Sequence, residues 1–293
     1  MSLKSLTLVS TEKFSEAEVI NYFKNNYNLS IKDILVLADN AIQITISEYD
    51  DIKSEDIRET LDQKKIDFCI KKKTDIQFKI LLCDMDATMI ANETLDDLVK
   101  ISGSNLNVDE TSKLAMEGKI DLRTTLKNRV QALKGHPKEL IEEVKKGIKF
   151  NPGGKTLVRT LNSLGFISNL VTGGFKPISS YVGETLGFHY VISNEFTFDN
   201  NNNFTGEYIP ITEENNSKFK YMEKISKERD IDFDEMVAVG DGSNDLEMLR
   251  NSGLGMGYYP HQIIKDNIET HIKYTDLTSI LYFLGIKNSD FVN

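Results

Sequence analysis

The sequence predicts an α/β protein in which a small α+β unit precedes a parallel sheet covered by helices on both faces. After residue 78, apolar runs without polar alternation recur, for example at 80–83 and 236–239, as is typical of strands buried on both faces. Amphipathic helical stretches separate these runs, and such alternation of α and β elements indicates an open parallel sheet. Before residue 75, strand-like segments instead alternate apolar and polar residues.

Residues 1–75 are expected to form a unit of their own. Strands are predicted at 6–9, 31–38, 42–46 and 66–70, and helices at 14–27 and after Ser54, a candidate N-cap. This βαββαβ order is that of a ferredoxin-like plan. The basic run 71–73 is expected to be solvated where a linker would fall. Because the segment contains no cluster of catalytic residue types, we expect a regulatory or structural role.

Residues 76–89 and 149–293 are expected to form the core. Strands are predicted at 80–83, 166–171, 190–192 and 236–239, and residues 155–164 predict a helix that Gly165 ends. Residues 195–208 form a candidate hairpin whose turn is the polar segment 199–203. Residues 90–148 are charged, helix-favouring and almost free of strand signal, so we expect a helical cap inserted after the first core strand.

The composition limits the classes of molecule that the protein is expected to bind. The chain has 293 residues, of which 40% are hydrophobic and 27% are charged, and its formal net charge of −10 disfavours binding to nucleic acids or anionic membranes. An anionic substrate would therefore need a local electropositive pocket. Two cysteines, no apolar run of membrane-spanning length and no secretory signal predict a cytoplasmic protein.

The main chemical signal is the segment Asp84-Met85-Asp86-Ala87-Thr88, directly after the first core strand. Ligand sites in open α/β sheets lie at the carboxyl ends of strands. Two carboxylates there can lie near one Mg²⁺, one can attack phosphorus, and the other can move protons. An isolated Asp-x-Asp pair is more often a solvated turn, so the assignment needs further support.

Two later strand ends provide that support. Residues 170–171 run into Thr172-Gly173-Gly174, a hydroxyl followed by glycines whose amides can approach a phosphate. Residues 236–239 run into the acidic turn 240–245, in which Asp241 could complete a cation site. Between them lies Lys218, whose ammonium could offset charge on a phosphate. Each feature alone is commonly a turn or a surface residue; their order along the chain makes them informative.

This series of motifs resembles the haloacid dehalogenase (HAD) superfamily of phosphotransferases, over residues 78 to 285. The resemblance implies a Rossmann-like parallel core with an inserted cap. It implies that Asp84 is the nucleophile, that Asp86 is the acid/base, and that Mg²⁺ binds the side chains of Asp84 and Asp241 and the backbone carbonyl of Asp86. Phosphate-binding groups are implied at Thr172, Gly173, Lys218 and Asn244, with Asp245 behind them.

The cap resembles that of the phosphoserine phosphatase family, in the segments 92–94 and 115–119. This resemblance implies that Glu93 receives the substrate ammonium, that Met116 contacts the substrate, and that Arg129 binds its carboxylate through a bidentate fork. It implies hydrolysis of O-phospho-L-serine to L-serine through an aspartyl-phosphate, the last step of serine biosynthesis.

Three positions depart from the family pattern. Ala87 stands where a serine is usual and Leu122 where some members have phenylalanine, and either could alter rate or specificity. Thr172 replaces a serine but keeps a hydroxyl.

Two other functions stay open at this stage. A HAD phosphotransferase or phosphatase for another phosphoamino acid, with homoserine as one acceptor, would use the same motifs. Residues 1–75 resemble the ACT-like regulatory domain of longer family members, which implies serine binding or dimerisation; an amino-acid sensor with a vestigial phosphatase fold is the second alternative. Two further sets of residues are expected to be structural or on the surface: His136, His189, His261 and His271, and the cysteines Cys69 and Cys83.

Overall fold

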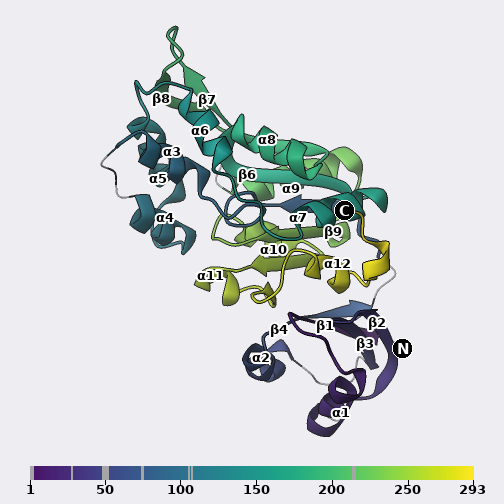
Figure 1. Ribbon diagram of the computed structural model, residues 1–293. Coiled ribbons are helices and arrows are strands. Elements are labelled where there is room, and N and C mark those ends of the chain that lie inside the picture. The colour runs from purple at the N-terminus through teal and green to yellow at the C-terminus, as the bar shows by residue number, and fades with distance from the viewer. Residues whose placement is uncertain are drawn as a thin grey trace.

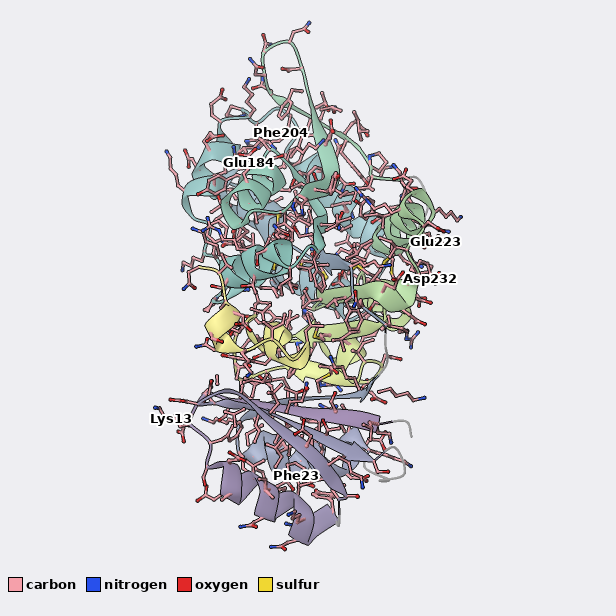
Figure 2. All side chains as sticks on the ribbon, turned by 90° about the vertical axis from the view of Figure 1, so that its right-hand side faces the viewer. Lys13, Phe23, Glu184, Phe204, Glu223 and Asp232 are labelled. Carbon is pink, nitrogen blue, oxygen red and sulfur yellow. The ribbon has the colours of Figure 1, made fainter. Side chains whose placement is uncertain are left out.

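In the computed structural model, the described residues are 3–27, 29–47, 53–73, 76–104, 106, 108–212 and 216–293. Residues 1–2, at the start of the predicted first unit, and residues 74–75, at its end, lie outside the described residues. The molecule is elongated, with the N-terminal unit at one end and a β-hairpin at the other (Figure 1). Figure 2 shows the same arrangement, with Phe23 in the N-terminal unit and Phe204 near the opposite end. None of the helices among the described residues is long and apolar enough to cross a membrane.

The N-terminal unit has the predicted βαββαβ order. Its elements are β1 (Leu3–Ser10), α1 (Glu16–Tyr27), β2 (Ile31–Ala38), β3 (Ala41–Ser47), α2 (Ser54–Gln63) and β4 (Ile66–Lys73). The strands are antiparallel in the order β2-β3-β1-β4. Apolar side chains from these strands and from both helices form one buried cluster.

Two local predictions in this unit were wrong. Ser54 is the first residue of α2, not its N-cap; the cap is Lys53, whose amide donates to the Asp56 carboxylate over 3.1 Å. The basic run 71–73 does not fall in a linker but continues β4 and pairs with residues 3–5 of β1, because the available edge of β1 extends the strand beyond its apolar residues. Lys72 of this run is exposed, as expected.

The core is a parallel sheet in the order β11-β10-β9-β5-β6-β7, with β8 antiparallel to β7 at its edge. The strands are β5 (Ile80–Cys83), β6 (Ile167–Lys176), β7 (Tyr190–Phe198), β8 (Phe204–Ile209), β9 (Met236–Gly240), β10 (Leu254–Tyr258) and β11 (Thr270–Ile272). The helices of the core are α7 (Gly154–Ser163), α8 (Ile178–Leu186), α9 (Ser217–Arg229), α10 (Leu246–Asn251), α11 (Gln262–Lys265) and α12 (Ser279–Phe283). Short 3₁₀ helices occupy Phe233–Glu235 and Asn288–Asp290.

Both faces of the core sheet are covered, as predicted from its apolar strands. Leu81 and Cys83 of β5 belong to one apolar cluster, whereas Ile80 and Leu82 belong to another. All four side chains have no exposed surface. Because side chains alternate along a strand, only a sheet with helices on both faces buries every residue of β5.

Strand β6 does not end where the sequence predicted. It continues through Thr172-Gly173-Gly174 to Lys176, and its pairing with β7 shifts register between Val171 and Phe175. The Thr-Gly-Gly segment is therefore a bulge inside a strand rather than a loop after it. Strand β7 is also longer than predicted, since it forms the expected hairpin with β8.

The segment between β5 and β6 is helical, as expected. It contains α3 (Thr94–Ile101), α4 (Val108–Met116), α5 (Leu122–Ala132) and α6 (Leu140–Lys146), which lie to the left of the core in Figure 1. The β7–β8 hairpin contacts this group, and the amide of Gly135 donates to the carbonyl of Phe204 over 2.8 Å. The division into domains at 1–75, 90–148 and the remainder stays a prediction.

The N-terminal strands and the core strands form one sheet, which the sequence did not predict. Strand β4 pairs with β11 in antiparallel fashion at Phe68 and His271. The buried carboxylate of Asp67 accepts hydrogen bonds from the amides of residues 273, 274 and 275 and from the Thr275 hydroxyl. This carboxylate thus holds the connection after β11 against the N-terminal unit.

His271 at this junction makes folding sensitive to pH. Its ring is nearly buried; Nδ1 lies 3.0 Å from Nη1 of Arg58, and Nε2 lies 2.7 Å from the Ile268 carbonyl. A neutral ring with its proton on Nε2 satisfies both contacts. Burial, and then the Arg58 charge, lower the pKa of His271 from 6.5 to about 4. Between pH 6.5 and about pH 4, His271 is therefore mostly protonated in the unfolded chain and mostly neutral in the folded chain.

We predict that the stability contributed by His271 is lost as pH falls from about 6.5 towards 4. The expected loss between pH 7 and pH 5 is on the order of 1–2 kcal/mol. Urea unfolding of the wild type and of His271→Gln at both pH values measures it, since the difference between the two proteins should shrink at pH 5. A difference that is the same at both pH values would contradict this prediction.

Candidate active site

The predicted site residues meet at one cavity of about 440 Å³, at the carboxyl end of the core sheet and under the cap. All of them except Asp241 line it: Asp84, Asp86, Glu93, Met116, Arg129, Thr172, Gly173, Lys218 and Asn244. Asp241 lies directly beneath, and its carboxylate oxygen is within 4.8 Å of oxygens of Asp84 and Asp245. Residues spread over 160 positions of the sequence thus contribute to one site.

A buried lysine lies between two carboxylates at the floor of the cavity. Lys218 Nζ is 2.6 Å from Asp84 Oδ1 and 2.7 Å from Asp245 Oδ1, and all three side chains are almost completely buried. Burial alone would lower the pKa of Lys218, but the charges of Asp245 and Asp84 hold it above its ordinary value. The ammonium therefore stays charged beside the end of β5.

The carboxylates around Lys218 repel one another as like charges. Burial raises the pKa of Asp84, and Lys218 opposes that shift. Burial also raises the pKa of Asp86 to about 6, although Asp86 Oδ1 accepts a 2.8 Å hydrogen bond from the Thr94 amide. A carboxyl group with a pKa near 6 exchanges protons readily near neutral pH, which suits an acid/base.

The acidic cluster fits a divalent cation. The oxygens of Asp245 are already engaged, since Oδ1 contacts Lys218 and Oδ2 accepts from the amides of Asp241 and Gly242 at 3.2 Å. Asp84 and Asp241 remain as carboxylate ligands, the number that Mg²⁺ usually takes. Burial, and then the charges of Asp84 and Asp245, raise the pKa of Asp241 well above its ordinary value, and a bound cation would relieve this crowding.

His261 was assigned to a structural or surface role, but it lies beside this cluster. Its Nε2 is 3.6 Å from Asp241 Oδ2, and its amide donates to the Asp241 carbonyl over 2.9 Å. No sequence pattern marks this position, because a separation of twenty positions between Asp241 and His261 is not a ligand spacing.

The bulge in β6 forms the wall of the cavity beside Asp86. The amide of Gly174 donates to the Thr172 hydroxyl over 2.8 Å, which fixes the turn. Asn194 of β7, which the sequence analysis missed, lines the cavity and donates to the Gly173 carbonyl over 2.7 Å. Across the cavity, the buried Oδ1 of Asn244 has no hydrogen-bond partner among the described residues. An unpaired buried oxygen at a cavity indicates a group that a ligand or its water would satisfy.

The loop after Asp84 turns sharply. Ala87 has a φ of +53°, in the left-handed region that residues other than glycine rarely adopt, and its amide donates to the Asn92 carbonyl over 3.1 Å. The turn directs the chain from β5 into the cap. Ala87 is not among the described residues that line the cavity. A serine at this position would therefore place its hydroxyl outside the cavity lining.

The cap is docked on the core through the acidic turn. The amide of Ser243 donates to the Met116 carbonyl over 2.9 Å, and its hydroxyl donates to the Ala115 carbonyl over 2.8 Å. These contacts bring Glu93 and Arg129 over the cavity. Burial, and then the charges of Asp86 and Asp96, raise the pKa of Glu93 well above its ordinary value. Asp96, which the sequence analysis did not single out, forms an ion pair with Arg129 at 2.7 Å.

The fold and the site define a phosphate-processing hydrolase of the HAD type. The chain belongs to the family of haloacid dehalogenase-like hydrolases, which residues 81–250 match.

Similar individual proteins include phosphoserine phosphatases. A phosphoserine phosphatase from Methanocaldococcus jannaschii is 32% identical over 206 residues, which cover 70% of this chain and 97% of that protein. One from Haemophilus influenzae is 28% identical over 283 residues, which cover 96% of this chain and 86% of that protein.

Solved structures agree with this result. A substrate-bound phosphoserine phosphatase complex is 32% identical, with a TM-score of 0.67 over 72% of this chain and 99% of that one. A HAD family hydrolase from Salmonella enterica serovar Typhi has a TM-score of 0.83 over 96% of this chain and 98% of that one. At 22% identity it supports the fold alone, across the N-terminal unit and the core together.

Gly174 allows the bulge to pass close to Asp86. A Cβ there would lie 2.8 Å from Met85 Cε and 3.1 Å from Asp86 Oδ2, whereas a Cβ at Gly173 meets nothing within 4 Å. We predict that Gly174→Ala lowers kcat for a phosphomonoester on the order of 10- to 100-fold, because Asp86 must move. The control is Gly147→Ala, which lies outside the residues that line the cavity and where a Cβ meets nothing closer than 3.5 Å; it should change kcat little. Equal losses in the two variants, compared by steady-state kinetics and unfolding midpoints, would sink the argument.

Proposed function

We propose that this protein is a phosphoserine phosphatase, which hydrolyses O-phospho-L-serine to L-serine and phosphate. The observation that carries the proposal is the charge pattern of the cavity. Lys218 and the acidic cluster lie at one end and Arg129 of the cap lies at the other, while Glu93 lies between them, close enough to feel the charges of both Asp84 and Arg129. A small molecule with a phosphate, an ammonium and a carboxylate has the complementary pattern. The phosphoserine phosphatases among its relatives support the same substrate.

In the proposed reaction, Asp84 attacks phosphorus and forms an aspartyl-phosphate while Asp86 gives its proton to the serine oxygen. Asp86 then takes a proton from water, which attacks the same phosphorus and releases phosphate. Lys218, the Thr172 hydroxyl, the Gly173 amide and Asn244 hold the phosphoryl oxygens.

We propose Mg²⁺ as the cofactor, held by Asp84, Asp241 and the backbone carbonyl of Asp86. When bound, it would offset the negative charge of the transferring phosphoryl group. The support is the fit of the donor set described above, together with the oxygen-only chemistry of these ligands.

We predict that a panel of phosphate esters will identify phosphoserine as the preferred substrate. O-Phosphoserine, O-phosphothreonine, O-phosphoethanolamine and a sugar phosphate should be compared with and without Mg²⁺. Turnover of phosphoserine should need the cation and exceed that of the others. Mass spectrometry with added homoserine separates hydrolysis, which yields phosphate alone, from transfer to an acceptor. A preference for a sugar phosphate would overturn the substrate assignment.

We predict that Asp84→Asn abolishes both turnover and covalent labelling of the protein with phosphate. The amide keeps the size of the side chain but is not a nucleophile, so no aspartyl-phosphate can form. Rapid acid quenching of the wild type and the variant with radiolabelled substrate measures the label. A labelled Asp84→Asn protein would mean that another residue attacks phosphorus.

The remaining features stay predictions. The N-terminal unit has the element order of an ACT-like domain, and serine binding or dimerisation through it would be tested by calorimetry and sedimentation. A cytoplasmic location agrees with two cysteines that are buried free thiols, Cys69 and Cys83.

A further inference from the structure

The guanidinium of Arg129 is held by other groups of the chain. Arg129 lies on α5 and Asp96 lies in the first turn of α3, and Arg129 Nε is 2.7 Å from Asp96 Oδ1. The two side chains are 8% and 6% exposed, so the pair is shielded from water although both residues line the cavity. An ion pair at this burial restrains its partners far more than a surface pair does.

Ser112 of α4 completes the arrangement. Its hydroxyl contacts Asp96 Oδ2 and also Nη2 of Arg129. The hydroxyl has one proton, so it donates to the carboxylate and accepts from the guanidinium, which has no acceptor of its own. Ser112 thus engages Nη2, whereas Asp96 Oδ1 lies beside the buried Nε as an ion-pair partner without the geometry of a hydrogen bond. Asp96 therefore acts on this edge through its charge and through Ser112.

The opposite end of the guanidinium is left for a ligand. Among the described residues, Nη1 of Arg129 has no hydrogen-bond partner, while Nη2 has a further contact with the Thr111 hydroxyl at 3.4 Å. A substrate carboxylate would thus meet the end that carries Nη1, because Nε is buried and Nη2 already contacts Ser112 and Thr111. Arginine has several rotatable bonds, and fixing its plane beforehand reduces the entropy lost when a carboxylate binds.

We propose that Asp96 is a positioning residue for substrate selection: with Ser112, it fixes the plane of Arg129 so that the enzyme prefers substrates that carry a carboxylate. The inference rests on the proposed function, since it concerns recognition of phosphoserine. The competing explanation is that the pair merely ties α3 to α5. The two differ in what they predict for a substrate without a carboxylate.

O-Phosphoethanolamine is phosphoserine without its carboxylate, and it is therefore the reference substrate. For Asp96→Asn, we expect kcat/KM for phosphoserine to fall roughly 10- to 100-fold, mainly through KM. Any change in kcat/KM for phosphoethanolamine reports the effects that both substrates share. Such effects are expected, because the Asp96 charge also acts on the pKa of Glu93 and of Asp86. The ratio of kcat/KM for phosphoserine to kcat/KM for phosphoethanolamine therefore isolates the effect on recognition of the substrate carboxylate.

The matched control is Asp97→Asn, the same substitution one residue further along α3. Asp97 accepts a 2.9 Å hydrogen bond from Asn92 and does not line the cavity, so the ratio should not change. In an Arg129→Ala background, Asp96→Asn should cause no further loss of preference, because Asp96 acts through Arg129. If Asp96→Asn fails to fold, Ser112→Ala removes the bridge, keeps both charges and should move the ratio in the same direction.

The outcomes separate the two proposals. The wild-type enzyme could prefer phosphoserine while Asp96→Asn leaves the ratio unchanged or lowers both kcat/KM values in proportion. That result overturns the positioning role alone. A further fall of the ratio in the Arg129→Ala background also overturns it. A wild-type enzyme with no preference for phosphoserine over phosphoethanolamine overturns both this inference and the substrate assigned above.

Discussion

Lys218 lies between the carboxylates of Asp84 and Asp245, and the rest of the site depends on this buried contact. Removing one partner of a buried ion pair typically costs about 3–5 kcal/mol, because an uncompensated charge is left in the interior. Here one cation serves two carboxylates, and Asp245 in turn accepts from the amides of the acidic turn. The same lysine therefore holds Asp84 at the end of β5 and fixes the turn that contains Asp241.

This network joins elements that are distant in sequence. Asp84 follows β5, Lys218 lies on α9, and Asp245 precedes α10, while β5 and β9 are adjacent parallel strands. The turn after β9 also accepts the cap, through the two hydrogen bonds of Ser243 to residues 115 and 116. A shift in the acidic turn would thus displace both the cation site and the cap that covers it.

The core and its chemistry were largely predictable from the sequence, since buried strands and the motifs at their ends are local patterns. Asp84 and Asp86 lie at such a strand end, whereas Lys218 of α9 was identified only through its place in the series of motifs. The missed features depend on contacts across the fold. Strand β11 has three residues and no strand pattern of its own, and its pairing with β4 could not be anticipated. Asp67 reads as a polar residue of an alternating strand, yet it is 1% exposed and accepts four hydrogen bonds.

The first turn of α3 explains why the two ends of the substrate site are mechanically linked. The Thr94 amide donates to Asp86 at the phosphate end, and Asp96, two residues later, contacts Arg129 at the carboxylate end. Glu93, which precedes the helix, lines the cavity between them. Because residues within one helical turn have fixed relative positions, α3 restrains Asp86 and Arg129 relative to one another through Thr94 and Asp96. In the proposed reaction, a substrate of a different length would engage Arg129 only by moving its leaving oxygen away from Asp86. Under that proposal, selection by length and proton transfer to the leaving group depend on the same few residues.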